Sequence, residues 1–310
     1  MIAIVGGLGA AICWALATVA SSRSSRMLGS RVVLAWIMIV GTVVGLPLAL
    51  VSGVPAEVPP EAPVLLVVAG LAYSGGLYVA YRALIIGKVG IVAPIVATEG
   101  ALAALMAVAL GDTLGAQAGI LLAVIAVGVI LSAVEPARPV VPAGDIELEA
   151  DALDGPAPAT LGEQAPAPAH EEHLREAVLL SILAAVIFAV GLVASGKAAV
   201  LVPPIWVALT ARLIGLVVVA APLILQRRLT LTRAAAPLVV LSGVGEIVGS
   251  TLSAWGATDS IAVVAVLGSQ FAAIAAVLAF FLFGERLSRI QVVGVVLIIV
   301  GVTALAAFSA

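Results

Sequence analysis

The sequence predicts an all-α integral membrane protein whose ten transmembrane helices form two inverted repeats of five helices. Three observations predict this fold class: an apolar composition, apolar blocks of spanning length, and a partial match between the two halves. Hydrophobic residues make up 63% of the 310 residues and charged residues 10%, whereas a soluble domain is about half apolar and a quarter charged. The mean hydropathy of +1.30 agrees with a chain that lies mostly in lipid.

Ten apolar segments are long enough to cross the roughly 30 Å hydrocarbon core of a bilayer as helices. They are residues 2–21, 32–52, 64–86, 89–110, 116–134, 177–196, 203–225, 236–257, 260–283 and 290–308. The first segment lacks the basic start and the cleavage site of a signal peptide, and nine further segments follow it. We therefore expect it to be a retained transmembrane helix.

One long polar segment, residues 135–176, separates the two groups of five apolar segments. It holds ten of the seventeen acidic residues and is rich in Ala and Pro, a composition that cannot bury a core. His170 and His173 lie in it at a spacing of three and without an evident third ligand, which favours a solvated linker over a metal site. The predicted organisation is a first repeat at 1–134, a disordered acidic linker at 135–176, and a second repeat at 177–310.

The two halves match weakly but at several places when one is shifted over the other. A shift of 173 residues brings "ALMAVALGDTLG" (104–115) onto "VLAFFLFGERLS" (277–288), and a shift of 174 brings "VASSR" (19–23) onto "VASGK" (193–197). The shift of 173 also brings three glycines of the first half onto three of the second: Gly70 onto Gly243, Gly76 onto Gly249, and Gly128 onto Gly301. Because a five-helix unit crosses the membrane an odd number of times, its copy must be inverted, as in many secondary transporters.

The basic residues predict the orientation of the chain. Twelve of the fourteen Lys and Arg residues lie in the loops and flanking turns that follow the odd-numbered segments. By the positive-inside rule these loops are cytoplasmic, so both termini are predicted outside and the linker 135–176 inside, in a multi-pass protein of the plasma or inner membrane.

Several stretches are similar to one known family. These are "GERLSRIQVVGVVLIIVGV" (284–302), "YRALIIGKVGIVAPI" (81–95) and "CWALATVASSR" (13–23). The chain resembles the ten-helix drug/metabolite transporter superfamily, and specifically its EamA-type permeases. The resemblance implies a transporter of small organic molecules rather than an enzyme, with substrates such as amino acids, nucleosides or cationic drugs. The first repeat departs from the family in having "GDTL" in place of an acidic GE-type motif, and the family's commoner orientation has cytoplasmic termini.

Three ionisable residues lie near the middle of predicted spans, where such groups usually face a cavity or one another. They are Glu99 in the fourth span, Arg212 in the seventh and Glu246 in the eighth. Arg212 can neutralise only one of the two acids, which leaves the other able to take up and release a proton. We expect Glu99 to be the titrating acid, because its own span offers few polar neighbours. In the alternative, buried hydrogen bonds satisfy both acids, which then only hold helices together.

Other polar or aromatic side chains could line a substrate and proton pathway. Tyr73, Ser74 and Tyr78 lie on the third span, Ser250 follows Glu246 by one helical turn, Gln270 lies on the ninth span and Trp14 on the first. Packing between helices explains Trp14 equally well.

These features predict a secondary active transporter of a small organic metabolite such as an amino acid, working by alternating access. Export is the favoured direction, and proton exchange is favoured over uniport as the energy source. The sequence offers no constellation for a membrane-embedded enzyme, and we predict no catalytic residue, cofactor, metal ion or nucleic-acid partner. The predicted partners are the substrate, protons and the lipid bilayer, with the protein a monomer or a homodimer. A sensor or scaffold acting through the acidic linker is the alternative from another class.

Overall fold

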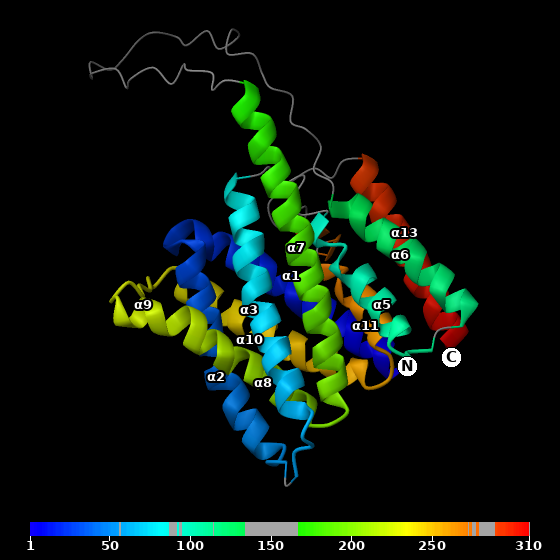
Figure 1. The fold of residues 1–310 in the computed structure, drawn as a ribbon, viewed down its shortest axis with the longest axis horizontal. Coiled ribbons are helices and arrows are strands. Elements are labelled where there is room, and N and C mark those ends of the chain that lie inside the picture. Colours follow the sequence, from blue (N-terminus) through cyan, green and yellow to red (C-terminus); the bar gives the residue numbers. More distant parts are fainter. Residues whose placement is uncertain are drawn as a thin grey trace.

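The computed structural model describes residues 1–55, 57–86, 92, 95–113, 115–133, 167–271, 273–274, 277–278 and 289–309. Every regular element within these residues is helical, and Figure 1 shows their arrangement. The helices are α1 (Ile2–Leu28), α2 (Ser30–Val51), α3 (Ala62–Ile86), α5 (Glu99–Ala109), α6 (Ala116–Ala133), α7 (Ala167–Ala199), α8 (Pro204–Gly215), the π-helix η1 (Leu216–Ala220), α9 (Ala221–Leu225), α10 (Ala236–Ala257), α11 (Ile261–Gly268) and α13 (Arg289–Ser309). Most of the predicted linker and the "GERLS" stretch at 284–288 lie outside the described residues.

Several helices are long and apolar enough to cross a membrane. In the described part of the chain there are six such segments: the first 24 residues of α1, then α2, the first 19 residues of α3, α7 from Arg175, the continuous run α8–η1–α9, and α10. Helices α5, α6 and α13 contain shorter apolar stretches, and α11 lies in the ninth predicted span. The described residues thus confirm an all-helical fold with several helices long and apolar enough to span a membrane. Ten helices in two inverted repeats stay a prediction.

Glycine shapes the corner between the first two helices. Helix α1 continues to Leu28, seven residues beyond the predicted span, and α2 begins at Ser30, so Gly29 alone joins them. Gly29 has a φ of +85°, a conformation that residues with a Cβ rarely adopt. Arg23 therefore lies within α1, five residues before its end, rather than in a loop.

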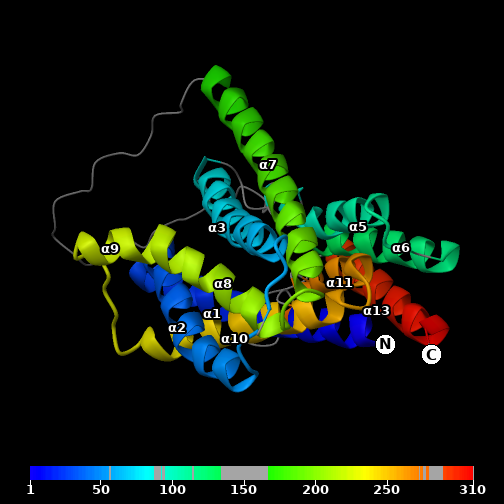
Figure 2. The same ribbon diagram turned by 60° about the horizontal axis from the view of Figure 1, so that its bottom comes forward.

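The two halves of the chain pack against each other rather than forming separate bundles. Helix α1 packs on α10, α3 on α7, α2 on α8, α5 on α11 and α6 on α13. Figures 1 and 2 both place α6 and α13 side by side at one side of the molecule, with α2 and α9 at the opposite side. Most of the buried residues are Ala, Gly or Val, which let the helix backbones approach closely.

Glycines provide these close approaches, and they do so in matched pairs. A Cβ on Gly76 of α3 would lie 2.7 Å from the ring of Phe188, and one on Gly249 of α10 would lie 2.8 Å from the ring of Trp14. The other two glycine pairs that the shift of 173 matches behave alike. Gly70 contacts Ile214 and Gly243 contacts Val40, while Gly128 contacts Ile298 and Gly301 contacts Ile125.

Two predicted spans are interrupted. In the fourth span the backbone turns at Ala97–Thr98, and α5 begins at Glu99, which was expected in the middle of a continuous helix. In the ninth span α11 ends at Gly268, and Ser269–Gln270 form a turn. Side-chain hydroxyls bond to the backbone at both places: Thr98 donates to the carbonyl of Ile95 at 2.6 Å, and Ser269 donates to the carbonyl of Val266 at 2.9 Å. Such local bonds offer the backbone an alternative to a continuous helix.

Helix α7 starts earlier than the apolar pattern indicates. It begins at Ala167, inside the segment assigned to the linker, and its first turns extend beyond the end of α3 in both ribbon views. The stretch "HEEHLREA" at 170–177 is rich in Glu, Leu, Arg and Ala, which favour a helix without needing burial. Hydropathy detects the apolar part of this helix and misses its polar start.

Candidate functional site

A fully buried arginine lies at the centre of the candidate site. Arg212 belongs to α8, and none of its surface is exposed. Its aliphatic stem packs against Gly41 of α2, where a Cβ would come within 3.0 Å of the arginine Cδ. The absence of a side chain at Gly41 therefore leaves space on α2 for the stem of the Arg212 side chain.

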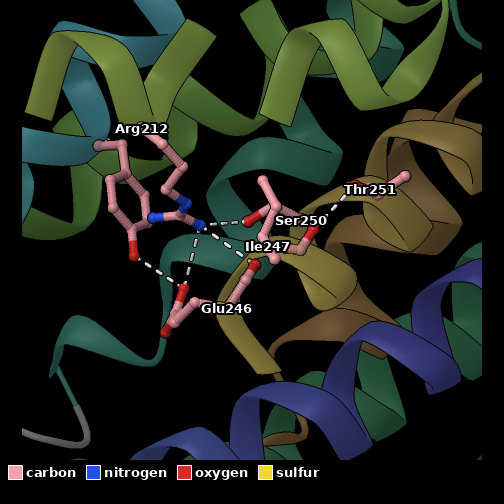
Figure 3. Close-up of polar contacts among 6 residues, drawn as sticks. Arg212, Glu246, Ile247, Ser250 and Thr251 are labelled. Atoms are coloured by element: carbon pink, nitrogen blue, oxygen red, sulfur yellow. Dashed lines mark hydrogen bonds and ion pairs between the residues drawn. The ribbon is translucent and has the colours of Figure 1, made fainter. Parts of the chain in front are cut away.

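Arg212 forms an ion pair with Glu246 of α10. Its Nη2 lies 3.2 Å from the Oε2 of Glu246 and also donates to the backbone carbonyl of Glu246 at 3.1 Å. The same nitrogen donates to the hydroxyl of Ser250, one turn further along α10, at 2.6 Å (Figure 3). The side chain of Glu246 is 19% exposed, so the pair is closed from solvent on the arginine side only.

Tyr73 of α3 completes the network. Its hydroxyl donates to the Oε2 of Glu246 at 2.8 Å, and its ring centre lies 4.5 Å from the Cζ of Arg212. A cation over a tyrosine ring is attracted by the negative face of the ring, an attraction that grows where water is excluded. Tyr73 and Glu246 are 173 residues apart, so they occupy matching positions of the two halves.

Several buried donors on α8 and α3 have no hydrogen-bond partner among the described residues. The Nε and Nη1 of Arg212 and the hydroxyl of Ser74 are buried without a hydrogen bond to any described atom. Ser74 follows Tyr73 on α3 and lies close to α8, since a Cβ on Gly215 would be 3.4 Å from its hydroxyl oxygen. Arg212 thus uses one of its three nitrogens, although an unsatisfied buried donor is costly.

The remaining predicted pathway residues lie outside this cluster. Trp14 packs into Gly249 and meets the ring of Phe271 edge-on at 6.4 Å, and its indole nitrogen has no described partner. The amide nitrogen of Gln270 is likewise buried without one. Tyr78 is 59% exposed. The structure therefore brings Arg212, Glu246, Tyr73 and Ser250 together. Ser74 lies on the next position of α3 beside Gly215 of α8, and Trp14, Gln270 and Tyr78 lie elsewhere.

Glu99 has a different environment. It is the first residue of α5 and half-buried, and no described residue forms a hydrogen bond or ion pair with its carboxylate. The next residue, Gly100, lies against α11, where a Cβ would come within 2.6 Å of the hydroxyl oxygen of Ser269. Helices α5, α6 and α11 carry no other ionisable residue, and those of α7 from Arg175 onward lie near its two ends.

Acidic residues also tie helix ends together at the edge of the bundle. The Oδ2 of Asp112 accepts from the hydroxyl of Ser260 at 3.1 Å and from the backbone N–H of Ala262 at 2.9 Å. Asp112 therefore caps the start of α11. Asp259 accepts from the backbone N–H of Ala3 at 3.1 Å, a bond that lowers the pKa of this carboxyl.

A comparison with protein families matches the chain over residues 1–134 and 175–307 to the EamA-like transporter family. The chain belongs to this family. The protein is therefore a multi-pass membrane transporter of the drug/metabolite type, which acts on small molecules in a lipid bilayer. The matched residues leave out 135–174, nearly the whole of the predicted linker.

A solved structure shares the fold of this EamA-family protein. This crystal structure of another protein aligns with a TM-score of 0.73 at 20% identity, and the match covers 99% of this chain and 97% of that one. No curated protein matches the sequence. The identity of 20% shows the fold alone, so the substrate must be argued from the site.

Two residues of this EamA protein that shape the site and its surroundings were not singled out as such from the sequence. Gly41 has no signal beyond being a glycine within an apolar span, although glycines at helix contacts are common in membranes. Asp112 stood out as part of a motif, but its bond to α11 joins residues almost 150 positions apart. Among the described residues, no three His, Cys, Asp or Glu side chains come close enough to hold a metal ion.

Proposed function

We propose that this protein is a secondary active transporter that exports a small organic metabolite, such as an amino acid, by alternating access between two inverted five-helix repeats. The observation that carries the proposal is the buried Arg212–Glu246–Tyr73 network, which joins α3 of the first half to α8 and α10 of the second. Ionisable groups inside a membrane bundle are costly and are usually retained for substrate or ion pathways.

The reciprocal contacts between the halves support the inverted repeats. Trp14 and Phe188 occupy matching positions 174 residues apart, and each fills the space beside a glycine of the opposite half. The pairs α1–α10 and α3–α7 likewise exchange roles between the halves. A two-fold axis between the repeats requires such exchange, and transporters of this kind bind substrate near that axis.

The interrupted spans also support a transport role. The turns at Ala97–Thr98 and Ser269–Gln270 lie in spans that correspond between the halves, and α5 packs on α11. Interrupted helices at corresponding positions of two repeats are the best pointer to a binding region in transporters with this architecture.

Glu99 is the proposed proton carrier. Glu246 is already neutralised by Arg212, whereas Glu99 has no described charged partner and stands where α5 begins beside α11. An acid that faces each side of the membrane in turn, protonated on one side and ionised on the other, couples export to proton entry. We place the protein in the plasma or inner membrane. The distribution of Lys and Arg residues supports an orientation with both termini outside the cell and the linker in the cytoplasm.

Flux through the purified protein in sealed vesicles tests the proposal. A library of amino acids, nucleosides and amines is screened with and without an imposed pH gradient, first for the natural chain and then for Glu99→Gln. We expect one class of compounds to accumulate against its gradient, and Glu99→Gln to remove the effect of the pH gradient while exchange of substrate continues. Glu61→Gln, at an exposed carboxylate before α3, is the matched control.

Two results would contradict the proposal. Flux that responds to the pH gradient equally in Glu99→Gln and in the natural chain would exclude Glu99 as the proton carrier. A complete lack of flux for every class of compound would exclude this kind of transport.

A further inference from the structure

An exposed group of arginines lies in the loop 226–235, which connects α9 to α10 at the edge of the bundle (Figures 1 and 2). Three residues of this loop are exposed and form what we call the arginine patch: Arg227, Arg228 and Arg233. The loop is fastened to α2, because the Nε1 of Trp36 donates to the carbonyl of Thr230 at 2.9 Å. The patch therefore has a defined place in the fold.

The helices beside the loop hold no acidic residue that could neutralise the patch. In the described part of the chain, none of the three side chains forms an ion pair or a hydrogen bond. Residues 1–56 carry no Asp or Glu, and residues 204–257 carry only Glu246, which pairs with Arg212 inside the bundle. Three positive charges are thus left for a partner outside these helices.

The position of the loop restricts what that partner can be. One apolar segment of spanning length ends at Leu225 and the next begins at Ala236, so the loop lies at the surface of the bilayer. Its apolar side chains are exposed beside the arginines: Leu225 is 83% exposed and Leu231 is 43% exposed. Exposed leucines next to cations suit acyl chains and phosphate groups together, whereas a soluble anion or an acidic peptide segment would leave the leucines in water.

The backbone of Arg227 adds an independent observation. Helix α9 ends with two bonds that close its last turn: the N–H of Arg228 donates to the carbonyl of Leu223 at 2.9 Å, and the N–H of Arg227 donates to that of Ile224 at 3.0 Å. This kind of helix end places a left-handed residue where glycine is usual. Arg227 has a φ of +54° and is, among the described residues, the only non-glycine residue with a positive φ. An arginine at this position costs stability, which points to a use for its side chain.

We propose that the arginine patch is a binding site for anionic phospholipids, whose phosphate groups are held by Arg227, Arg228 and Arg233 while their acyl chains lie against Leu225 and Leu231. A guanidinium group donates two parallel hydrogen bonds to a phosphate, so arginine is well suited to this contact. The site lies on the α9–α10 loop, apart from the Arg212–Glu246–Tyr73 network, and does not depend on the proposed transport function.

Lipid binding to the purified full chain in detergent tests the site. Phosphatidylglycerol and phosphatidylcholine with the same acyl chains are titrated separately, and native mass spectrometry counts the bound lipid. Each arginine near a headgroup contributes about 1 kcal/mol, or about fivefold, so we expect phosphatidylglycerol to bind at least about tenfold more tightly. Soluble glycerol phosphate, which has the phosphate without acyl chains, should not displace it at the same concentration.

Variants then assign the binding to the patch. The double variant Arg227→Gln with Arg228→Gln removes two of the three charges, and we expect phosphatidylglycerol to bind about 25-fold more weakly. The matched control is Arg175→Gln with Arg289→Gln, which removes two exposed arginines on α7 and α13. We expect that control to change the affinity by less than about threefold, since its arginines lie outside the loop.

Arg227→Gly separates lipid binding from a structural role. Glycine adopts a positive φ without strain, so we expect this variant to unfold at the same or a higher temperature in the absence of lipid. The same variant loses one guanidinium, and we expect phosphatidylglycerol to bind about fivefold more weakly. An arginine retained only for the fold would not show a loss of binding without a loss of stability.

Several outcomes would overturn the lipid site. They are equal binding of phosphatidylcholine and phosphatidylglycerol, displacement of the lipid by soluble glycerol phosphate, and unchanged binding in either the double variant or Arg227→Gly. A preference for phosphatidylglycerol that appears only after residues 140–165 are deleted would assign the arginines to the acidic linker instead. Binding that follows the expected pattern upholds the site whether or not the vesicles show flux.

Discussion

Glu246 and Glu99 are two acids of one apolar chain that the fold treats in opposite ways. Glu246 lies in the middle of α10, where Arg212 and Tyr73 both donate to it. Glu99 lies at the first residue of α5, next to an interruption in its span, and has no described side-chain partner. The start of a helix favours a negative charge through its dipole and its free N–H groups. The comparison teaches that the same residue type is paired with a cation in one place and stands at a helix start without a described partner in the other.

Removing Arg212 should cause the largest loss of unfolding free energy, because it takes the counter-ion from Glu246 and leaves Glu99 untouched. Arg212→Met leaves Glu246 without its counter-ion, and we expect the free energy of unfolding to fall by about 3–5 kcal/mol. The double variant Arg212→Met with Glu246→Leu should recover most of that loss, because it removes the remaining charge as well. Unfolding of the purified chains in detergent measures both values. A double variant as unstable as the single one would show that the pair contributes packing rather than charge compensation.

Replacing each acid by its amide compares the two sites directly. Glu246→Gln leaves Arg212 buried without a negative partner, and we expect a loss of about 3 kcal/mol in unfolding free energy. Glu99→Gln removes no described hydrogen bond or ion pair, so we expect a change within about 1 kcal/mol. The two variants are compared under identical detergent conditions. Equal losses would mean that Glu99 is held as firmly as Glu246.

The contact beside Glu99 offers a smaller test. A Cβ on Gly100 would lie 2.5 Å from the backbone carbonyl oxygen of Ala265, so Gly100→Ala should push α5 away from α11 and cost about 1–3 kcal/mol. Gly119 of α6 has open space around it, and Gly119→Ala should instead raise stability by about 0.5–1 kcal/mol. Thermal unfolding ranks the two variants. A tolerated Gly100→Ala would mean that α5 adjusts its position easily.

Removing the hydroxyl of Tyr73 should cause the smallest loss of unfolding free energy among these variants. Tyr73→Phe removes the bond to Oε2 of Glu246 but keeps the ring beside the guanidinium, so we expect a loss of about 1 kcal/mol. Tyr78→Phe is the matched control, since Tyr78 is 59% exposed. Similar losses in both variants would contradict a specific role for the bond between the halves.

Much of the site could be predicted because polar groups in an apolar chain are few. Polar side chains within the predicted spans stand out by composition alone, among them Arg212, Glu246, Tyr73, Ser74 and Ser250. Helical spacing places Ser250 beside Glu246. The choice of partner could not be derived from composition, since Glu99 and Glu246 are both central in their predicted spans. Only the packing of α8 on α10 decides that Arg212 reaches Glu246.

Other features depend on contacts that no local pattern reports. The interruption before Glu99 lies inside an uninterrupted apolar run, so hydropathy predicts one continuous helix there. Helical spacing groups Tyr78 with Ser74, but α7 and α8 both pack on α3, and their positions leave Tyr78 exposed. The roles of Trp14 and Gln270 in transport stay predictions.

The early start of α7 has a mechanical consequence. Eight residues of this helix precede Arg175, where its apolar part begins, and at 1.5 Å per residue they form a rod of about 12 Å. A rigid rod converts a tilt at its base into a larger displacement at its tip. Because α7 packs on α3 and α5, any rocking of the bundle is transmitted along it to the segment that joins the two halves. A fluorescent or spin label near Ala167 would therefore report a tilt of α7 as a change in the position of the label.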